Sequence, residues 1–352
     1  MLRILFFIKS FGPGYNNSGV YDAAKYTADF IANEMSSYEK IECLVIPVKN
    51  EEEIVKVTTD IPYNFIIIEG IWADPEKITN VPKYFMAVRC HSQWSFMDPF
   101  ATSLIFKYSK MGVLTIFNEY ETYKIFKTTE DNSFFQGECW YLPNVFPVHD
   151  DIPFVPLSER SEPTKFKIGM FGELRPMKNH TMQAMVLRRV SKKLYEKYGI
   201  TTELHINTSL DADPVLNSIR TICFEEGSNL ALKEHFWLKG EEFNKVIAEM
   251  NLGLQVSFTE TFNLTSARFI NNGVPVIAST AVSWLPKRYT VQAHSPFELY
   301  EAVMAMAKPD NSFFRRVFNT GETALDLERS ALFTYVRRAK YRWTKFINSL
   351  LG

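Results

Sequence analysis

The sequence predicts an α/β protein made of two doubly wound, Rossmann-like parallel-sheet domains. Short apolar runs rich in β-branched and aromatic residues recur along the chain, and a polar loop and a helical pattern follow each run. The stretch from Leu252 to Ser279 shows this unit most fully, with a strand up to Phe258, a polar turn, a helix over 265–271 and a second apolar run after Gly273. The same order fills both halves of the chain, which predicts two similar domains.

Length and composition favour an ordinary globular protein. The chain has 352 residues, 46% of them hydrophobic and 22% charged, and its formal net charge is −1. That charge gives no general attraction to nucleic acid or membrane, so any such partner must meet a local patch. The apolar start is too short for a signal peptide and predicts a first strand, and no run reaches the roughly 20 residues of a membrane-spanning helix.

The four cysteines are scattered and form no CxxC pair, which argues against zinc and predicts reduced thiols in a cytoplasmic protein. They are Cys43, Cys90, Cys139 and Cys223.

The domain boundaries follow from a change in composition. Residues 1–150 are predicted to form an N-terminal domain, and the proline-rich, charged segment 151–165 a linker. Residues 166–325 are predicted to form a C-terminal domain, and residues 326–352 a basic C-terminal helix. The strands expected in the first domain are 2–9, 41–48, 65–69, 84–90, 113–117 and 140–142.

Polar residues follow several strands of the first domain: Glu69, His91, Asn118 and Asn144. Ligands of a doubly wound sheet bind outside the carboxyl ends of its strands, so we expect these side chains at a ligand crevice. For His91 a structural hydrogen-bonding role and a functional role both stay open.

The loop after the first strand, S-F-G-P-G-Y-N-N-S-G, is rich in glycine. Such a loop lets a ligand approach the backbone, although it is not a GxGxxG sequence and an ordinary connection is an equally open interpretation. Its candidate acceptor-binding residues are Gly14, Tyr15, Ser18 and Gly19.

The second domain has two loops suited to a sugar diphosphate. After its first strand, Gly172 opens a loop that carries Arg175 and Lys178 near a helix start, where two cations and free helix amides suit phosphates. Either cation alone would also fit a solvated surface position. A later loop carries Glu260, a partner for hydroxyls, and leads into a second helix start. The amides expected to point outward there belong to Asn263, Leu264 and Thr265.

Two segments, G-M-F-G-E-L-R-P-M-K-N-H and T-E-T-F-N-L-T-S-A-R-F-I-N-N-G-V-P-V-I-A-S, resemble motifs of retaining GT-B glycosyltransferases of the group 1, family 4-like kind. The resemblance implies two domains facing across a cleft, with the acceptor on the N-terminal domain and a nucleotide-sugar donor on the C-terminal domain. By similarity, Arg175 and Lys178 would neutralise the pyrophosphate, and Glu260 would hold donor hydroxyls. The amides of 263–265 would cap a phosphate, and His91 would touch the sugar.

The sequence departs from this family at Arg268. The family usually carries a second Glu eight positions after the first, which holds the ribose of the nucleotide, and Arg268 stands at that position. An arginine cannot accept hydrogen bonds from hydroxyls. Arg268 would instead bind a phosphate, or it would indicate a different nucleotide pose or an unusual donor. We count Gly172, Asn144 and Arg268 among the expected donor-binding residues.

The resemblance also implies a mechanism. The anomeric configuration would be kept, and the leaving phosphate would accept the proton of the attacking hydroxyl. Arg175, Lys178 and helix amides would stabilise the growing charge. No metal and no cofactor would be needed, and a UDP- or GDP-sugar would be the donor substrate. The acidic pair at 211 and 213 fits a cap for the helix at Pro214 better than a metal site.

The acceptor stays open among three readings: a glycan or lipid-linked sugar, a hydroxymethylated base in DNA as with phage glycosyltransferases, or no acceptor at all in a non-catalytic sugar-nucleotide-binding protein. The C-terminal helix either packs back on the N-terminal domain or makes a peripheral contact with a membrane or with nucleic acid. Its basic residues are Arg337, Arg338, Lys340, Arg342 and Lys345.

Overall fold

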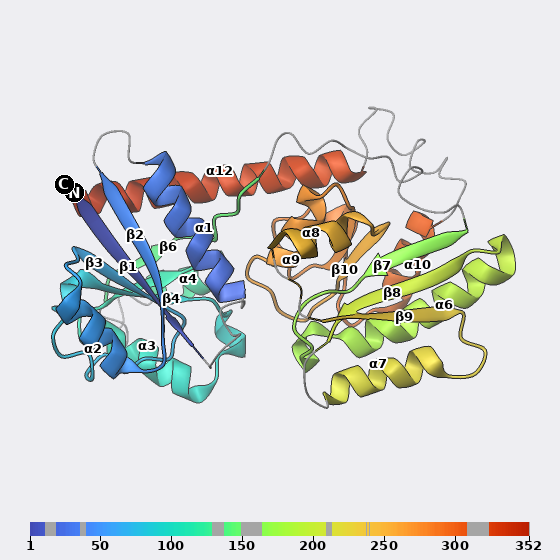
Figure 1. The fold of residues 1–352 in the computed structure, drawn as a ribbon, viewed down its shortest axis with the longest axis horizontal. Helices are drawn as coiled ribbons and strands as arrows, with labels where there is room; N and C mark the ends of the chain where they lie inside the picture. The colour runs from blue at the N-terminus through green and yellow to red at the C-terminus, as the bar shows by residue number, and fades with distance from the viewer. Residues whose placement is uncertain are drawn as a thin grey trace. The chain divides into compact units, whose positions relative to one another are not determined.

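The computed structural model describes most of the chain and divides it into two compact units. Unit 1 comprises Met1–Pro147 and Tyr335–Gly352, and unit 2 comprises Val148–Thr334. Figure 1 shows one parallel sheet flanked by helices in each unit. The described residues are 1–10, 19–35, 40–128, 137–148, 164–208, 213–236, 238, 240–307 and 324–351.

Unit 1 alternates strands and helices, as the sequence predicts. Its sheet has the order β2-β1-β3-β4-β5-β6, and every neighbouring pair is parallel. The elements are β1 (Leu2–Lys9), α1 (Gly19–Glu34), β2 (Ile41–Val48), α2 (Glu51–Asp60), β3 (Phe65–Glu69), β4 (Met86–Cys90), α3 (Pro99–Lys110), β5 (Leu114–Phe117), α4 (Tyr120–Thr128) and β6 (Cys139–Tyr141).

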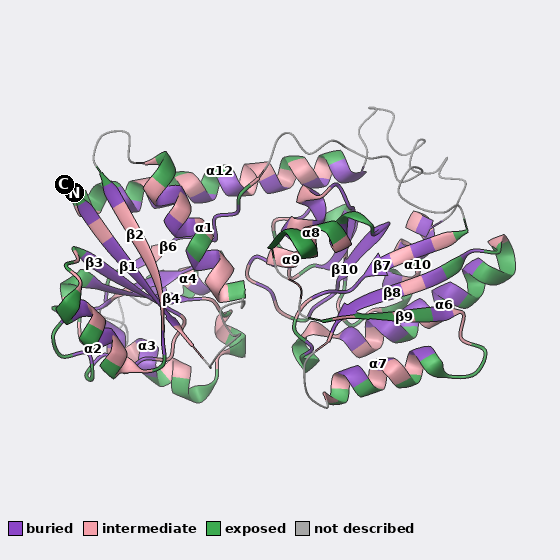
Figure 2. Cartoon of the chain, in the orientation of Figure 1, coloured by how far each residue is buried: buried purple, intermediate pink, exposed green. Residues whose placement is uncertain are grey.

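Successive side chains of a strand point to opposite faces, and this alternation places neighbouring side chains of β1 in different core clusters. Ile4 and Phe6 of β1 lie in one buried cluster with residues of α1 and of the C-terminal helix α12 (Ala324–Leu351). Leu5 and Phe7 lie in another cluster with residues of α2 and α3. Buried residues therefore run along the central strands and the inner faces of the helices (Figure 2). Apolar residues of α12 from Tyr335 onward thus form part of the core of unit 1.

Unit 2 repeats the architecture. Its sheet has the order β12-β11-β10-β7-β8-β9, again with parallel pairs throughout. Residues 151–163 of the predicted linker lie outside the described part, and Lys165 already opens the first strand. The elements are β7 (Lys165–Gly169), α6 (His180–Tyr198), β8 (Thr201–Asn207), α7 (Pro214–Phe224), β9 (Leu230–His235), α8 (Gly240–Ala248), β10 (Leu252–Gln255), α9 (Leu264–Asn271), β11 (Val276–Ser279), β12 (Thr290–Val291) and α10 (Pro296–Ala307).

Two strand glycines let helix α9 approach the sheet of unit 2. A Cβ at Gly253 would lie 2.6 Å from the ring of Phe269, and one at Gly169 would lie 2.7 Å from the same ring. Phe269 also stacks on Phe171, with ring centroids 5.8 Å apart. The absence of these two side chains therefore sets the depth of α9, the helix whose start the sequence predicts as a phosphate site.

The strand orders place the topological switch points. In unit 2 the chain runs from β7 outward through β8 to β9, and then crosses to β10 on the other side of β7. The loops after β7 and β10 therefore diverge at the carboxyl edge, where open α/β sheets bind ligands. In unit 1 the corresponding point lies between β1 and β3.

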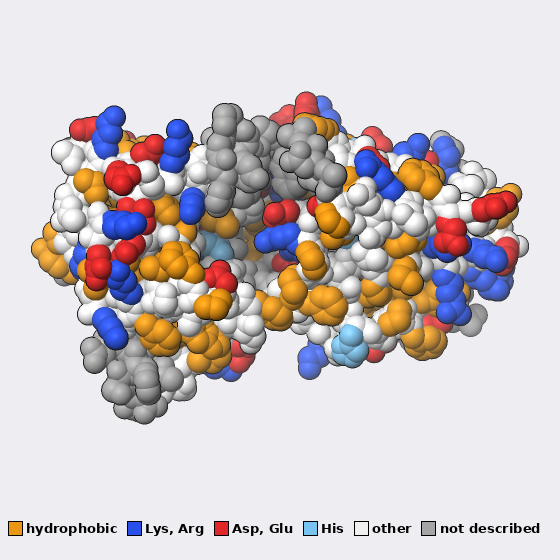
Figure 3. Space-filling model, turned by 90° about the horizontal axis from the view of Figure 1, so that it is seen from below, with side chains coloured by type: hydrophobic (Ala, Val, Ile, Leu, Met, Phe, Trp, Pro, Cys, Tyr) orange, Lys and Arg blue, Asp and Glu red, His pale blue; other side chains and the backbone are white. Residues whose placement is uncertain are grey.

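No helix in the described part of the chain is long and apolar enough to span a membrane. Figure 3 shows basic and acidic side chains interspersed over one face of each unit, which agrees with the net charge of −1.

Candidate functional site

The switch point of unit 2 holds an ion pair between two predicted site residues. Lys178, at the end of a short 3-10 turn after β7, has its Nζ 2.5 Å from Oε1 of Glu260, which follows β10. The Lys178 side chain is 23% exposed and that of Glu260 is 8% exposed. The carboxylate of the pair is thus almost fully buried, while about a quarter of the lysine side chain stays exposed.

Buried polar side chains fix the two loops that carry the pair. The carboxamide of Gln183, on α6, donates to the carbonyl of Lys178 at 2.9 Å and accepts from the amide of Val256 at 3.1 Å. The amide of Phe258 donates to the carbonyl of Met177 at 2.9 Å. These hydrogen bonds join the two loops and fix their backbones. The two side chains of the ion pair are therefore held near each other by the scaffold.

The start of α9 is ordered by Asn263, which adopts a left-handed conformation with φ 59°. Its Oδ1 accepts from the amide of Ser266 at 2.7 Å, and its Nδ2 donates to Gln255 at 3.1 Å. The amides of Leu264 and Thr265 belong to the same first turn, where intrahelical carbonyls are not available to them. This geometry suits an anion at the helix start.

Three other predicted site residues of unit 2, two for donor binding and one for catalysis, have partners within it. The amide of Gly172 donates to Asn207 Oδ1 at 2.9 Å. Arg175 is exposed and lies 3.1 Å from the carboxylate of Glu173. The half-buried Arg268 has its guanidinium carbon 5.4 Å from the centroid of the Phe243 ring.

A pocket of ≈ 320 Å³ opens beside the start of α6. It is lined by Arg175, Pro176, Asn179, His180, Thr181, Pro214, Val215 and Ser218. Burial, with a smaller contribution from Lys178, lowers the pKa of His180 to about 3, so this histidine is neutral and leaves Lys178 and Arg175 as the cations of the α6 start.

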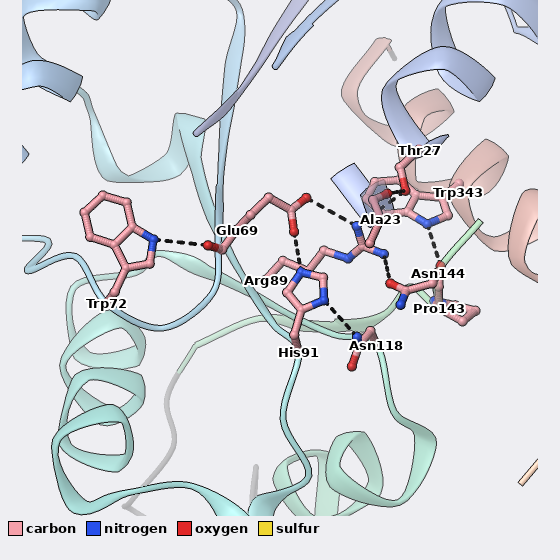
Figure 4. Close-up of polar contacts among 10 residues, drawn as sticks. All are labelled: Ala23, Thr27, Glu69, Trp72, Arg89, His91, Asn118, Pro143, Asn144 and Trp343. Carbon is pink, nitrogen blue, oxygen red and sulfur yellow. Dashed lines mark hydrogen bonds and ion pairs between the residues drawn. The ribbon is translucent and has the colours of Figure 1, made fainter. Parts of the chain in front are cut away.

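Unit 1 holds a buried polar cluster at the carboxyl edge of β3 to β6 (Figure 4). Glu69 Oε1 lies 3.2 Å from the Arg89 guanidinium, and Glu69 Oε2 lies 2.5 Å from Nε2 of His91. Asn118 Nδ2 donates to Nδ1 of His91 at 3.1 Å, and Arg89 donates to Asn144 Oδ1 at 2.7 Å. The four polar residues predicted at strand ends therefore meet, because their strands are neighbours in the sheet.

Helices α1 and α12 enclose the Arg89 guanidinium. Its carbon lies 5.0 Å from the centroid of the Trp343 ring, and NH1 lies 3.4 Å from the hydroxyl of Thr27. The indole of Trp343 donates to the carbonyl of Pro143 at 2.9 Å. Arg89 and Trp343 are both fully buried. The C-terminal helix thus completes the cluster that holds His91.

The charges in this cluster follow from burial and pairing. Burial alone would raise the pKa of Glu69, but Arg89 and His91 outweigh it and hold the pKa below its usual value. Burial lowers the pKa of His91 and outweighs the opposing effect of Glu69. Glu69 is therefore ionised while His91 is neutral, with a proton on Nε2 facing Glu69 and a lone pair on Nδ1 facing Asn118.

Sequence reasoning missed Arg89 and Trp343. The signal for Arg89 was present, since it is the single charged residue in the buried strand run M-A-V-R-C. A charge inside such a strand requires a partner, and Glu69 ends the adjacent strand. Trp343 lies in the predicted C-terminal helix, for which packing on the N-terminal domain was one of the open interpretations, but its partner could not be inferred from the sequence.

Of the predicted acceptor loop, Gly14, Tyr15 and Ser18 lie outside the described residues, and Gly19 is the first residue of α1. The described part of the chain contains no group of three or more His, Cys, Asp or Glu side chains that could hold a metal ion.

Comparisons with known proteins identify the fold. No family model and no curated protein matches the sequence. Among solved structures, HepE from Anabaena, in complex with UDP and glucose, matches with a TM-score of 0.69 at 13% identity, over 99% of this chain and 100% of that chain. A UDP-forming α,α-trehalose-phosphate synthase from Burkholderia xenovorans, in complex with glucose-6-phosphate, matches with a TM-score of 0.65 at 11% identity, over 99% and 100%. TarM from S. aureus, in complex with UDP among other ligands, matches with a TM-score of 0.58 at 14% identity, over 85% and 58%. These structures are GT-B glycosyltransferases, so the predicted GT-B fold is confirmed.

Proposed function

We propose that this protein is a glycosyltransferase that moves a sugar from a nucleotide-diphosphate sugar to an acceptor hydroxyl, with retention of the anomeric configuration. The observation that carries the proposal is the Lys178–Glu260 pair at the switch point of unit 2, beside the start of α9. A cation for phosphate, a carboxylate for hydroxyls and helix amides are the groups that a sugar diphosphate requires. The UDP-bound structures of the same fold add support.

In this proposal the leaving diphosphate binds Lys178, Arg175 and the amides of 264–265. Negative charge grows on the diphosphate as the glycosidic bond breaks, and the fixed ammonium stabilises that charge without reorganising at the moment of reaction. Glu260 accepts hydrogen bonds from the sugar hydroxyls, for which it exchanges part of its contact with Lys178. The leaving phosphate takes the proton of the attacking hydroxyl, and no step requires a metal or a cofactor.

His91 has a narrower role in the proposal. Both of its ring nitrogens are hydrogen-bonded within unit 1, and its side chain is 12% exposed. Direct contact with the sugar through Nδ1 requires the 3.1 Å hydrogen bond from Asn118 to open. Because Arg89 keeps Glu69 ionised, the imidazole keeps its orientation when that happens.

The donor is proposed to be a UDP- or GDP-sugar and the acceptor a glycan or lipid-linked hydroxyl. Arg268 favours a donor phosphate over a ribose hydroxyl at its position on α9, because a guanidinium donates hydrogen bonds and accepts none. We place the reaction in a reducing compartment such as the cytoplasm, because the four cysteines are free thiols.

The test is a comparison of two lysine variants of unit 2. Lys178→Ala should lower the release of sugar from a nucleotide sugar at least about a hundredfold, because it removes a charge aimed at the leaving group. Lys167→Ala, which removes a lysine that pairs with the exposed Glu249 at 3.4 Å, should leave the rate unchanged. Activity should survive EDTA, and NMR of the product should show the anomeric configuration of the donor.

Two results would contradict parts of this proposal. Near wild-type turnover by Lys178→Ala would remove the assignment of the leaving-group cation. Tight nucleotide-sugar binding without any transfer or hydrolysis would support a non-catalytic binding protein instead.

A further inference from the structure

A group of tyrosines and arginines forms one surface of unit 1, which we call the tyrosine–arginine surface: Tyr120, Tyr123, Tyr141, Arg338 and Arg342. The ring centroids of Tyr120 and Tyr123 lie 5.2 Å and 6.0 Å from that of Tyr141, and 6.2 Å from each other. The Arg342 guanidinium carbon lies 4.7 Å from the Tyr141 centroid, and Arg338 acts electrostatically on the same tyrosine. Residues from α4, β6 and α12 therefore make one continuous surface.

This surface lies at the carboxyl edge of the sheet. Tyr120 begins α4, two residues after Asn118, and Tyr141 ends β6, three residues before Asn144. Both asparagines belong to the cluster that holds His91. The surface is thus next to the edge at which an α/β domain presents its ligand.

The arginines of this surface are not held in ion pairs by the described residues. Arg338 and Arg342 are exposed one helical turn apart, with exposed Arg337 beside them, and none of the three forms an ion pair with a residue in the described ranges. The neighbouring Lys340, in contrast, lies 2.6 Å from Glu34. A carboxylate does lie nearby, that of Glu119, but it accepts hydrogen bonds from the amides of 121 and 122 at the start of α4.

The apolar side of α12 is already used. Trp343, Phe346 and Ile347 are buried in the core of unit 1. This part of the helix therefore presents positive charge to a membrane but no apolar face that could insert into it. Stable membrane anchoring requires both. Tyr120, in contrast, is 46% exposed and presents an aromatic ring at the edge of the charged surface.

We propose that the tyrosine–arginine surface binds single-stranded nucleic acid. The planar guanidinium groups match phosphate oxygens, and tyrosine rings stack on bases of any sequence. The binding claim does not depend on catalysis. It leaves the proposed acceptor, a glycan or lipid-linked hydroxyl, unchanged.

The test measures the fluorescence anisotropy of a labelled single-stranded DNA of about 12 nucleotides, between about 50 and 200 mM salt and without any sugar donor. The double variant R338S/R342S should reduce the slope of log Kd against log salt by about 1.4, since each lost phosphate contact on a single strand contributes about 0.7. The matched control K192S/K193S removes two exposed lysines of α6 and should leave the slope unchanged.

The stacking part of the proposal has its own variants. Tyr120→Ala should weaken binding about 5- to 150-fold, because a base loses its aromatic partner. Tyr120→Phe should bind as the wild type does. Tyr84→Ala, at another tyrosine that is 71% exposed, should have no effect.

Three outcomes would overturn the proposal. They are the absence of DNA binding at the lowest salt, an equal loss of binding in R338S/R342S and in the lysine control, and an arginine-dependent preference for phosphatidylserine vesicles or an acidic polysaccharide over DNA. A protein that binds DNA through this surface but transfers no sugar would refute the proposed function alone.

Discussion

The charged side chains at the carboxyl edge of unit 1 are enclosed, whereas those at the same edge of unit 2 are partly open. Glu69 and Arg89 have no exposed side-chain area, and the polar groups of the cluster form hydrogen bonds mainly with one another. Lys178 keeps 23% of its side chain exposed beside Glu260. At one sheet edge the enclosed charges orient a histidine, and at the other a partly exposed cation lies beside its carboxylate.

The difference shows how two similar sheets come to shield their charges to different degrees. In unit 1, helix α12 adds Trp343 over the guanidinium and excludes water, which makes a missing partner costly. In unit 2, hydrogen bonds of Gln183 join the loops after β7 and β10, and the Lys178 side chain stays partly exposed.

The largest expected effect breaks the enclosed cluster. Arg89→Met should lower the free energy of unfolding by about 3–5 kcal/mol, because it leaves the carboxylate of Glu69 buried without its cation. Urea denaturation measures this loss. Arg3→Met is the matched control, since Arg3 pairs with Glu42 at 2.7 Å in the same sheet but both side chains are partly exposed. That variant should lose less than about 1 kcal/mol, and equal losses would mean that enclosure is not what distinguishes the cluster.

The next effect tests which unit holds the nucleotide. UDP or GDP at about 100 times its Kd should stabilise the wild type by about 2.7 kcal/mol, seen as a higher melting temperature. The shift should vanish in Lys178→Ala and persist in His91→Ala. A shift that depends on His91 and ignores Lys178 would reverse the proposed division of tasks.

A smaller effect concerns the depth of α9. Gly253→Ala should lower the free energy of unfolding by about 1–3 kcal/mol, because its Cβ would lie 2.6 Å from the Phe269 ring. Adding Phe269→Leu should restore part of the loss, which a double-mutant cycle measures. Strictly additive losses would show that the two residues do not compete for this space.

The smallest effect depends on pH. Glu328 on α12 is fully buried, with its carboxyl oxygens 3.2 and 3.3 Å from the amide of Val276, and burial raises its pKa well above the usual value. The folded state therefore keeps a proton that the unfolded state releases, so stability is lost as pH rises from the unfolded pKa toward the folded one. Glu328→Gln should raise the melting temperature more at pH 8 than at pH 5. Glu301→Gln, at an exposed position of α10, is the control, and a larger gain for Glu328→Gln at pH 5 would contradict the assignment.

The sequence predicted several residues of the candidate site but not the contacts among them. Lys178 and Glu260 were predicted from two loop motifs, because a lysine at a helix start and a carboxylate after a strand suit a sugar diphosphate. Their contact across 82 residues was not predicted, since it depends on β10 crossing to lie beside β7. Arg89 was missed because its partners come from β3, α1, the segment after β6 and α12.

The sequence by itself determined the alternation of strands and helices and the two similar halves, because apolar periodicity and turn residues act over short distances along the chain. The GT-B fold was expected from the resemblance of two motifs to a known family. Only the tertiary structure decided which polar groups meet. The order of strands in each sheet brings Glu69 to Arg89 and Lys178 to Glu260, and the return of the C-terminal helix sets Trp343 over the first of these pairs. Those contacts depend on chain crossings, and no local pattern of residues records where a chain crosses.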